Sequence, residues 1–256
     1  MTLQPARRPL ALITGGMRRV GAVIAIKLTM AGYDLAISSH ASGDMKPALT
    51  AALAASDGDW QGFAADLSDP AAAAKLIDDV TAHFGRVPDL LVNNAAMFGQ
   101  DQWPEMTMET LDAHFRLNLF APLLLSTALV AASGENARPC IINILDQRIT
   151  NPHGDQISYT LSKQALAASV RSMASAFAGR ARVNGVAPGL VISTDDYDAA
   201  LESRLAKMMP LGTLPDPDGV ADAVHYLAGA RHVTGQIIYA DAGAHLKSFD
   251  RDFMYL

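Results

Sequence analysis

The segment Thr14-Gly15-Gly16-Met17-Arg18-Arg19-Val20-Gly21 decides the fold that this sequence predicts. It follows the apolar run Leu10-Ala11-Leu12-Ile13 and precedes apolar residues that recur at helical spacing up to Ala31. Glycines between a strand and a helix let the backbone approach a pyrophosphate, and the amino terminus of the helix offers N–H groups and a positive partial charge. The turn therefore predicts a dinucleotide site. Its expected contacts are Gly15, Arg18, Arg19, Val20 and Gly21.

The remaining sequence alternates short apolar runs with longer segments of helical period. Further strands are predicted over 33–38, 60–65, 90–92, 140–145, 182–186 and 236–239, and helices over 71–84, 107–132, 157–178 and 218–227. Because Ile, Leu and Val fill both faces of these strands, the strands suit a parallel sheet that helices cover on both sides. We predict an α/β fold, a doubly wound parallel sheet in a single domain over 1–256. Its ligand is expected beyond the carboxyl ends of the strands.

Composition narrows the function. The chain has 256 residues and a net charge of -6, which argues against nucleic acid as the main partner. Cys140 is the single cysteine, so no intrachain disulfide is possible, and we expect a buried strand thiol. Residues 1–9 lack an apolar signal core, and no uninterrupted apolar run reaches the ~18 residues of a membrane span. We therefore expect a cytoplasmic protein that binds a small molecule, with neither a membrane nor a metal as its partner.

Two segments are expected to lie outside the regular alternation. The stretch 189–217 shows little period and carries acids at Asp195, Asp196 and Asp198. We predict a loop that closes over the substrate there, and an ordinary surface loop is the alternative. The tail 247–256 is aromatic and charged, and packing across a subunit interface is one hypothesis for it.

The end of the second strand discriminates between NAD and NADP. NAD sites usually carry an acid there, which hydrogen-bonds the ribose. Here the sequence is Ile37-Ser38-Ser39-His40-Ala41-Ser42, and the first carboxylate is Asp44. The missing acid, together with Arg18, favours a 2′-phosphate and hence NADP(H). Ser38 and His40 are the expected contacts, and for His40 an ordinary surface position is the alternative.

Tyr159 and Lys163 form the predicted catalytic pair. They are four residues apart, which places them on one face of a helix. A tyrosine ordinarily loses its proton near pH 10, and a lysine cation beside a bound nicotinamide favours the tyrosinate. The pair can therefore exchange a proton with a substrate near neutral pH.

Two amide-bearing segments complete the predicted site. Pro122 has no N–H, so the carbonyl of Asn118, four residues earlier, is free to bind water or a side chain. That carbonyl is a candidate station in a proton relay, and a simple helix kink is the alternative. Asn94 and Ala95 end the fourth strand, where amide and small side chains let a cofactor pack closely; a polar turn is the alternative.

These motifs resemble the short-chain dehydrogenase/reductase superfamily in their order and spacing from Thr14 to Leu246. The matching landmarks are the glycine turn, Ala65-Asp66-Leu67, Asn93-Asn94-Ala95, Asn118, Tyr159 with Lys163, and Val183-Asn184-Gly185-Val186-Ala187-Pro188-Gly189. The resemblance implies a Rossmann-like fold, hydride transfer from a nicotinamide, and a homotetramer formed through the helices 107–132 and 157–178. It further implies that Asp66 contacts adenine, that Lys163 holds the nicotinamide ribose and that Tyr159 donates the proton. The cofactor contacts that it implies are Asp66, Leu67, Asn94, Ala95, Lys163, Pro188 and Gly189.

One departure from the superfamily pattern is informative. Asp146 stands at the end of the fifth strand, where most members carry a serine. Together with Arg19 in the glycine turn, it makes the chain similar to the pteridine reductase and dihydromonapterin/dihydrofolate reductase branch. Phe98 matches a phenylalanine that stacks a pterin against the nicotinamide in that branch. The substrate contacts that this resemblance implies are Arg19, Phe98, Asp146, Tyr159 and Leu190.

Two of these residues have plainer interpretations. In the first, Asp146 does no more than cap the strand end. In the second, Phe98 belongs to the hydrophobic core.

Ala41 stands where some pteridine reductases have an arginine. The residues that remain to bind a 2′-phosphate are Arg18, Ser38, His40 and Ser42.

The leading hypothesis is NADPH-dependent reduction of a pterin, namely dihydromonapterin, dihydrobiopterin or dihydrofolate. Such a reaction delivers a hydride to carbon and a proton to nitrogen. The expected catalytic residues are Tyr159, Lys163, Asp146 and Asn118. The alternative is an NADPH-dependent reductase of a carbonyl or polyol. A catalytically silent nucleotide-binding regulator is a third hypothesis, which the presence of Tyr159, Lys163 and Asn118 disfavours.

Overall fold

One parallel sheet organises the protein. The structure is a computed structural model that describes residues 7–40, 45–191 and 198–256. Its seven strands lie in the order β3-β2-β1-β4-β5-β6-β7, and every neighbouring pair is parallel. The strands are β1 Leu10–Thr14, β2 Asp34–Ser39, β3 Trp60–Ala64, β4 Leu90–Asn93, β5 Cys140–Ile144, β6 Arg182–Pro188 and β7 Ile237–Ala240. The doubly wound, Rossmann-like fold is therefore confirmed, with its topological switch between β1 and β4.

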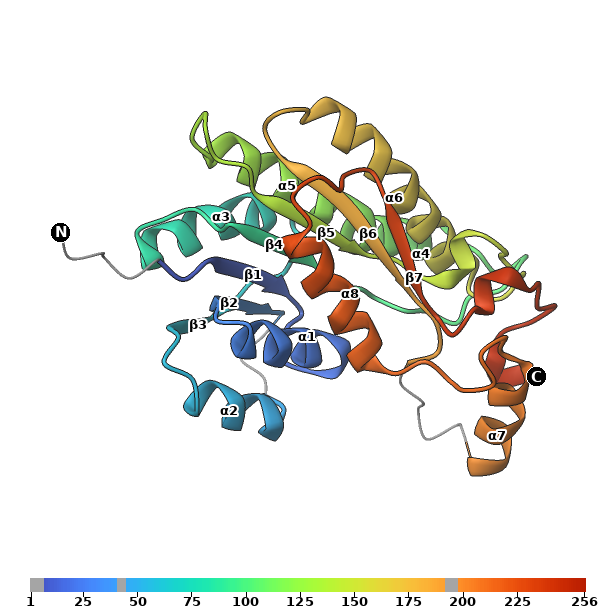
Figure 1. Cartoon of the computed structure of the whole chain (residues 1–256). Coiled ribbons are helices and arrows are strands. Elements are labelled where there is room, and N and C mark those ends of the chain that lie inside the picture. Colours follow the sequence, from blue (N-terminus) through green and yellow to red (C-terminus); the bar gives the residue numbers. More distant parts are fainter. Residues whose placement is uncertain (1–6, 41–44, 192–197) are drawn as a thin grey trace.

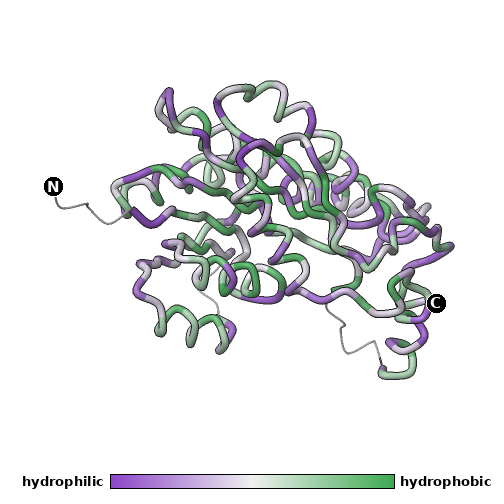
Figure 2. Tube along the Cα trace, viewed as in Figure 1, coloured by the Kyte–Doolittle hydropathy of each residue, from purple (hydrophilic) through white to green (hydrophobic). Residues whose placement is uncertain are grey.

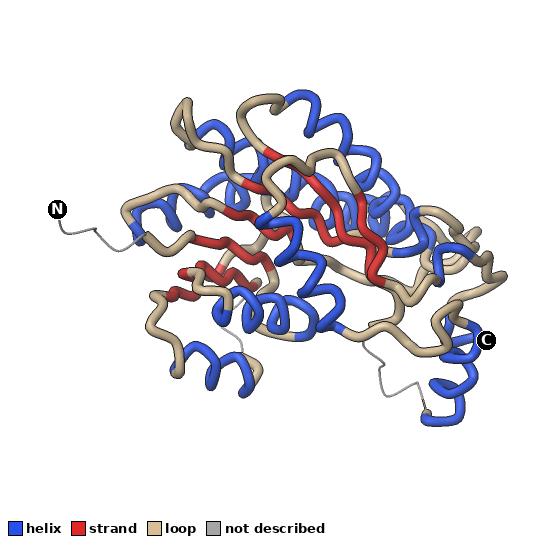
Figure 3. The backbone as a smooth tube through the Cα atoms, in the orientation of Figure 1, coloured by secondary structure: helices blue, strands red, loops and turns tan. Residues whose placement is uncertain are grey.

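Helices cover both faces of the sheet (Figures 1 and 3). One face carries α1 Arg19–Met30, α2 Pro47–Ala54 and α8 Pro217–Gly229. The opposite face carries α3 Pro70–Phe84, α4 Met108–Phe115, α5 Ala121–Ala132 and α6 Ile157–Ala176. Strands β1, β4 and β5 are buried along their whole length, because helices lie above and below them. In Figure 2 the middle of the sheet is accordingly coloured as hydrophobic.

Two helices were not predicted. The helix α2 begins with Pro47 in its first turn and buries Leu49 and Leu53, a short Ala/Leu-rich signal that is readable in the sequence. The helix α7, Ala199–Met208, lies inside the stretch for which little period was expected, so that expectation was wrong for these ten residues. The Asp198 carboxylate caps α7 by accepting a hydrogen bond of 2.7 Å from the N–H of Leu201. The predicted acids Asp195 and Asp196 lie outside the described residues.

The predicted helix 107–132 is continuous but not uniform. Thr107 is the N-cap of this helix and forms a capping box with Thr110. The chain then passes from α4 through a π-helical turn, Arg116–Phe120, into α5. The whole helical stretch Met108–Ala132 is long and apolar enough to cross a bilayer by length and composition. Leu125 and Leu129 of α5 are nonetheless fully buried in the domain, which makes this a core helix.

The C-terminal tail packs on its own chain. Phe249 and Phe253 are buried and contact each other at a centroid distance of 4.9 Å. They belong to a cluster with Leu205 and Met209 at the carboxyl end of α7. The tail therefore contributes to the end of the domain near α7 (Figure 1).

Candidate active site

A cavity of about 610 Å³ lies at the carboxyl ends of the strands, on the side that the fold predicts for a ligand. Seventeen of the predicted site residues line it: Gly15, Arg18, Arg19, Val20, Gly21, Ser38, His40, Asp66, Leu67, Asn94, Ala95, Phe98, Asp146, Tyr159, Lys163, Pro188 and Gly189. Asn118 and Leu190 are predicted site residues that do not line it. Leu190 instead packs against the cluster between α7 and the C-terminal tail, and its neighbour Val191 faces the cavity.

The glycine turn is packed against the end of β4. A Cβ atom on Gly21 would lie 2.3 Å from the carbonyl oxygen of Gly15 and 2.6 Å from Nδ2 of Asn94, so glycine is required there. Asn94 Nδ2 donates hydrogen bonds to the carbonyl oxygens of Thr14 at 2.9 Å and of Gly15 at 3.1 Å. The amide of Asn94 thus holds the turn in the shape that brings its backbone to the cavity.

Arg19 has a backbone conformation that favours glycine. Its φ is +51°, in the left-handed region, which explains why a glycine is common at this position. A non-glycine residue in this region costs about 1–2 kcal/mol, and such residues gather at functional sites. Arg18, the N-cap residue of α1, is extended, and the first turn of α1 holds no acidic residue. Two cations therefore face the cavity at the positive end of a helix, where they favour an anion.

The end of β2 offers groups that suit a 2′-phosphate. The hydroxyl of Ser38 is buried and has no hydrogen-bond partner among the described residues. His40 Nδ1 lies 3.5 Å from the Asp66 carboxylate. Hydrogen bonds from the hydroxyl and N–H of Ser68 lower the pKa of Asp66. The unpaired Ser38 hydroxyl and the nearby Arg18 therefore suit the phosphorylated ribose of NADP.

Tyr159, Asp146 and Lys163 meet at the base of the cavity. The Tyr159 hydroxyl donates a hydrogen bond of 2.9 Å to Oδ2 of Asp146. Lys163 Nζ donates one of 2.7 Å to the carbonyl of Ile144, the last residue of β5. Burial lowers the pKa of Lys163 to about 8, and the Asp146 carboxylate partly opposes that shift.

The surroundings of Tyr159 favour its protonated form. Burial and the negative charge of Asp146 hold the pKa of Tyr159 well above 10, and the tyrosinate expected beside a bound nicotinamide stays a prediction. The Arg148 cation opposes this shift only in part. Tyr159 is therefore a neutral phenol with its proton on the hydrogen bond to Asp146, a state suited to proton donation.

Asn118 takes part in the site through its side-chain amide, and the relay role predicted for its backbone carbonyl stays a prediction. It is fully buried in the π-helical turn. Its Oδ1 accepts from the N–H of Met97 at 2.8 Å, and its Nδ2 donates to the Met97 carbonyl and to the Ser162 hydroxyl, each at 3.0 Å. The amide therefore ties the segment before Phe98 to the helix that carries the Tyr–Lys pair.

Phe98 forms a wall of the cavity and is not core packing. It is 50% exposed, and its ring contacts Tyr159 edge-on at a centroid distance of 4.9 Å. The guanidinium of Arg148 lies 5.3 Å from the Phe98 ring and 5.7 Å from the Tyr159 ring. Sequence reasoning missed Arg148, although its position two residues after Asp146 was a signal that this segment is charged.

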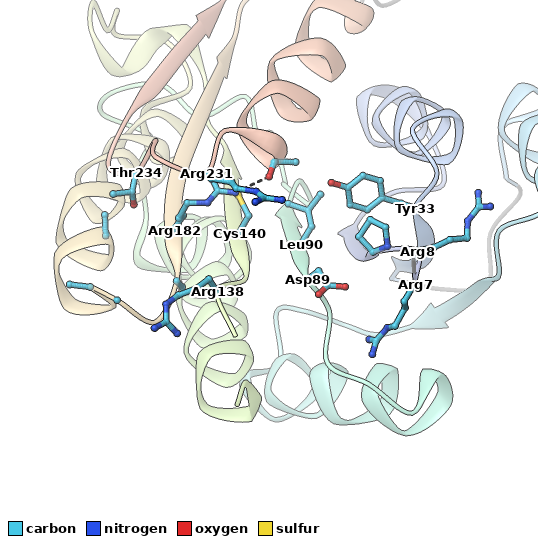
Figure 4. A pocket seen from close by; sticks show the side chains of 16 residues that line it. Arg7, Arg8, Tyr33, Asp89, Leu90, Arg138, Cys140, Arg182, Arg231 and Thr234 are labelled. Carbon is cyan, nitrogen blue, oxygen red and sulfur yellow. Dashed lines mark hydrogen bonds between the residues drawn. The ribbon is translucent and has the colours of Figure 1, made fainter. Parts of the chain in front are cut away.

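A larger cavity, of about 980 Å³, lies at the amino-terminal ends of the strands, opposite the candidate active site (Figure 4). It contains none of the predicted site residues and is formed by the amino ends of the central strands. Cys140 lines it as a buried strand thiol, as expected, and burial raises the pKa of that thiol to about 11. In Figure 4 the side chains of Arg138 and Arg7 lie on opposite sides of this cavity.

The family of the chain follows from a sequence comparison. Residues 16–245, which include the glycine turn from Gly16 onward and the Tyr159–Lys163 pair, match the family model described as enoyl-(acyl carrier protein) reductase. The chain belongs to the short-chain dehydrogenase/reductase superfamily. This short-chain reductase is thus an oxidoreductase, and its sheet order and Tyr–Lys helix are explained by common descent with that superfamily.

Individual relatives of this short-chain reductase differ in what they are named for. The putative ketoacyl reductase 2 of the granaticin polyketide synthase from Streptomyces violaceoruber is 29% identical over 96% of this chain and 100% of that protein. Pteridine reductase 1 from Leishmania tarentolae is 30% identical over 95% and 98%. The crystal structure of FolM alternative dihydrofolate reductase 1 from Brucella canis, complexed with NADP, superposes with a TM-score of 0.83 at 33% identity, over 93% of this chain and 95% of that one.

Proposed function

We propose that this short-chain reductase catalyses the NADPH-dependent reduction of a pterin, such as dihydromonapterin, dihydrobiopterin or dihydrofolate. The observation that carries the proposal is the hydrogen bond of 2.9 Å from the Tyr159 hydroxyl to the Asp146 carboxylate in the strand-end cavity. After the Tyr159 phenol has donated its proton to the substrate, the carboxyl group beside it can pass a new proton to the phenol.

The proposed cofactor is NADP(H). The pyrophosphate would lie on the glycine turn at Gly15 and Gly21, and the 2′-phosphate would lie near Arg18, Ser38 and His40. Ser42, the fourth residue expected to bind it, lies outside the described residues. The remaining proposed contacts are Arg19, Val20, Asp66, Leu67, Asn94, Ala95, Lys163, Pro188 and Gly189. When bound, NADPH supplies the hydride. The complex of the Brucella canis relative with NADP supports this choice.

The residues of this chain would supply the proton. Reduction of a C=N bond forms one C–H bond from the hydride and one N–H bond from a proton, and the Tyr159 hydroxyl would donate that proton. Asp146 would then return a proton from solvent to the phenol. Lys163, anchored on the Ile144 carbonyl, would hold the nicotinamide ribose beside them. Asn118 would act by positioning the segment that leads to Phe98.

Two side chains favour a flat, polar substrate. The half-exposed ring of Phe98 offers a stacking face next to Tyr159. Arg19, held in a strained backbone conformation, presents a cation to the same cavity, where it would pair with the polar edge of a pterin or with the pyrophosphate. The likeness to pteridine reductase 1 and to the FolM dihydrofolate reductase supports the same class of substrate.

The second candidate function is that of an NADPH-dependent reductase of a carbonyl or polyol substrate. The likeness to the granaticin ketoacyl reductase favours it, and the Tyr159–Lys163 pair would serve it equally well. A silent nucleotide-binding regulator is disfavoured by the complete Tyr–Lys pair.

Turnover of NADPH by the purified protein separates these functions. We expect oxidation of NADPH with dihydropterins and little with a panel of ketones and ketoesters. Asp146→Ser should lose pterin turnover under the first proposal and keep ketone turnover under the second. Tyr159→Phe is the control, because it should abolish both. No NADPH turnover with any substrate, in wild type and Tyr159→Phe alike, would instead support the regulator.

The assembly and location of this reductase are also proposals. We propose a homotetramer formed through α4, α5, the π-helical turn between them and α6, a surface on which Phe120, Leu124 and Leu161 are exposed apolar side chains. Sedimentation velocity measures the assembly directly. A cytoplasmic location accords with a reductase that draws on NADPH.

A further inference from the structure

A buried arginine links the proposed active site to the C-terminal tail. Arg148 is 7% exposed and its Nη2 is paired with the carboxylate of Asp252, which is 3% exposed. Its Nη1 donates a hydrogen bond of 3.0 Å to Oε1 of Gln156. Its Nε lies 3.9 Å from Oδ1 of Asp146. The guanidinium is therefore held between two carboxylates, one in the active site and one in the tail.

The same guanidinium also packs against the two aromatic rings of the site. It lies 5.3 Å from the centroid of Phe98 and 5.7 Å from that of Tyr159, within the range of cation–π contacts. Its positive charge opposes the effect of Asp146 on the pKa of Tyr159. The position of Arg148 therefore affects both Phe98, the ring proposed to stack on the substrate, and Tyr159, the proposed proton donor.

Asp252 is itself fixed from several sides. Its N–H donates a hydrogen bond of 2.8 Å to the carboxylate of Asp155, and its Oδ1 accepts one of 3.1 Å from the N–H of Met254. Arg251 lies on the other side of Asp155, with its Nη2 3.4 Å from that carboxylate. His153 Nε2 is 4.0 Å from Asp252 Oδ2. The carboxylate that faces Arg148 is therefore rigidly placed, although it lies near the end of the chain.

We propose that Asp252 is a positioning residue that acts on the active site through Arg148. Its carboxylate holds the guanidinium over the rings of Phe98 and Tyr159. Without that carboxylate, Arg148 would retain Asp146 as an anion within ion-pair distance. A guanidinium released from Asp252 would turn its N–H groups toward Asp146 and compete with the Tyr159 hydroxyl for that carboxylate. The inference rests on the proposed role of Tyr159 and Asp146, but not on the identity of the substrate.

A double-mutant cycle tests this role in the full chain. The variants are Asp252→Asn, Arg148→Gln and the two combined, and kcat and KM are measured with NADPH and the substrate that the wild type turns over. We expect Asp252→Asn to lower kcat about tenfold, which corresponds to roughly 1.4 kcal/mol of transition-state stabilisation. We expect the combined variant to be no slower than Arg148→Gln alone, because Asp252 then has nothing left to position.

The control variant is Asp250→Asn, which makes the same change of charge at an exposed tail carboxylate two residues before Asp252. It should leave kcat within twofold of wild type. Should Asp252→Asn reduce the folded fraction in a thermal melt, the same cycle is run with Asp252→Glu, which keeps the charge and displaces it.

Multiplicative losses in the combined variant would overturn the proposal, and so would an Asp252→Asn enzyme with unchanged kcat. Failure of the proposed function gives a different pattern. If ketones replace pterins as substrates, the cycle is measured with a ketone and retains its meaning. If Tyr159→Phe keeps full turnover, the catalytic assignment itself has failed, whatever the cycle shows.

Discussion

The Tyr159 hydroxyl donates its hydrogen bond to the Asp146 carboxylate, at 2.9 Å, and not to Lys163. The carboxylate comes from the turn after β5, and the phenol comes from the first turn of α6. Because the partner of the phenol is an anion, the negative charge and the burial of the site both raise the pKa of Tyr159. The pair therefore stores a proton at the point where the proposed reaction needs one.

Replacing Asp146 by Asn should move the alkaline limb of the pH profile to lower pH. The charged groups that face this point are Asp146, Arg148 and Lys163. Asp146 raises the pKa of both Tyr159 and Lys163, so its loss lowers both. In the wild type we expect activity to fall above pH about 8, as Lys163 loses its charge. The profile of kcat/KM against pH measures the shift, and Asp216→Asn, at the cap of α8 outside the cavity, is the control.

Replacing Lys163 by Met should stabilise the protein and remove its activity. Burial lowers the pKa of Lys163 from 10.5 to about 8, so at pH 7 the folded state carries a penalty of about 3 kcal/mol at 1.36 kcal/mol per unit. The carbonyl of Ile144 loses its partner, which costs about 1 kcal/mol. We therefore expect the free energy of unfolding to rise by about 2 kcal/mol in urea titrations.

The pH dependence of that gain has a definite sign. Between pH 8 and 10.5 the unfolded chain binds the Lys163 proton more strongly than the folded one, so this residue's contribution to wild-type stability rises with pH. The advantage of the Met variant should shrink across this window. An advantage that is equal at pH 7 and pH 10.5 would show that Lys163 carries no desolvation penalty.

Replacing Arg19 by Gly should separate stability from cofactor binding. Glycine relieves the left-handed conformation at φ +51°, for a gain of about 1 kcal/mol in the free energy of unfolding. The lost cation should raise the KM for NADPH roughly tenfold, since hydrogen bonds to charged groups contribute about 1.5–3 kcal/mol. Ala242→Gly is the matched control, because Ala242 has a φ of +55° and lies outside the cavity. It should gain stability with no change in KM, and an unchanged KM in Arg19→Gly would remove Arg19 from the binding site.

Replacing Asp34 by Asn should affect stability alone. Asp34 is the first residue of β2, at the amino-terminal ends of the strands and far from the candidate active site. Its carboxylate accepts hydrogen bonds of 2.5 Å from Arg86 and 2.9 Å from the N–H of Asp59. The substitution leaves the largely buried Arg86 cation without this partner, which should cost about 2 kcal/mol in chemical unfolding. Asp222→Asn, which breaks an exposed ion pair with Lys27, should change stability by less than about 0.5 kcal/mol. A fall in kcat for Asp34→Asn would contradict this separation.

Local patterns predicted most of the fold. The strands and helices around the glycine turn follow from apolar periodicity. A threonine caps the start of α4 at Thr107, and a left-handed glycine ends α3 at Gly85. The helix α7 was missed even though Leu201 and Leu205 are four residues apart behind a capping aspartate, because the acids and prolines around it indicated a loop. Leu190 was assigned to the substrate from resemblance alone; the structure shows its packing against the cluster between α7 and the tail, and the substrate contact stays a prediction.

The sequence by itself determined which groups stand at strand ends and on one helix face, because backbone geometry relates residues a few positions apart. The spacing of Tyr159 and Lys163 and the place of Asp146 after a strand belong to this class. Only the tertiary structure decided that the phenol bonds Asp146, and that Arg148 pairs with Asp252, 104 residues away. Contacts of that kind depend on how whole elements pack, and packing also sets the burial that makes Tyr159 a neutral acid and Lys163 a weakened base.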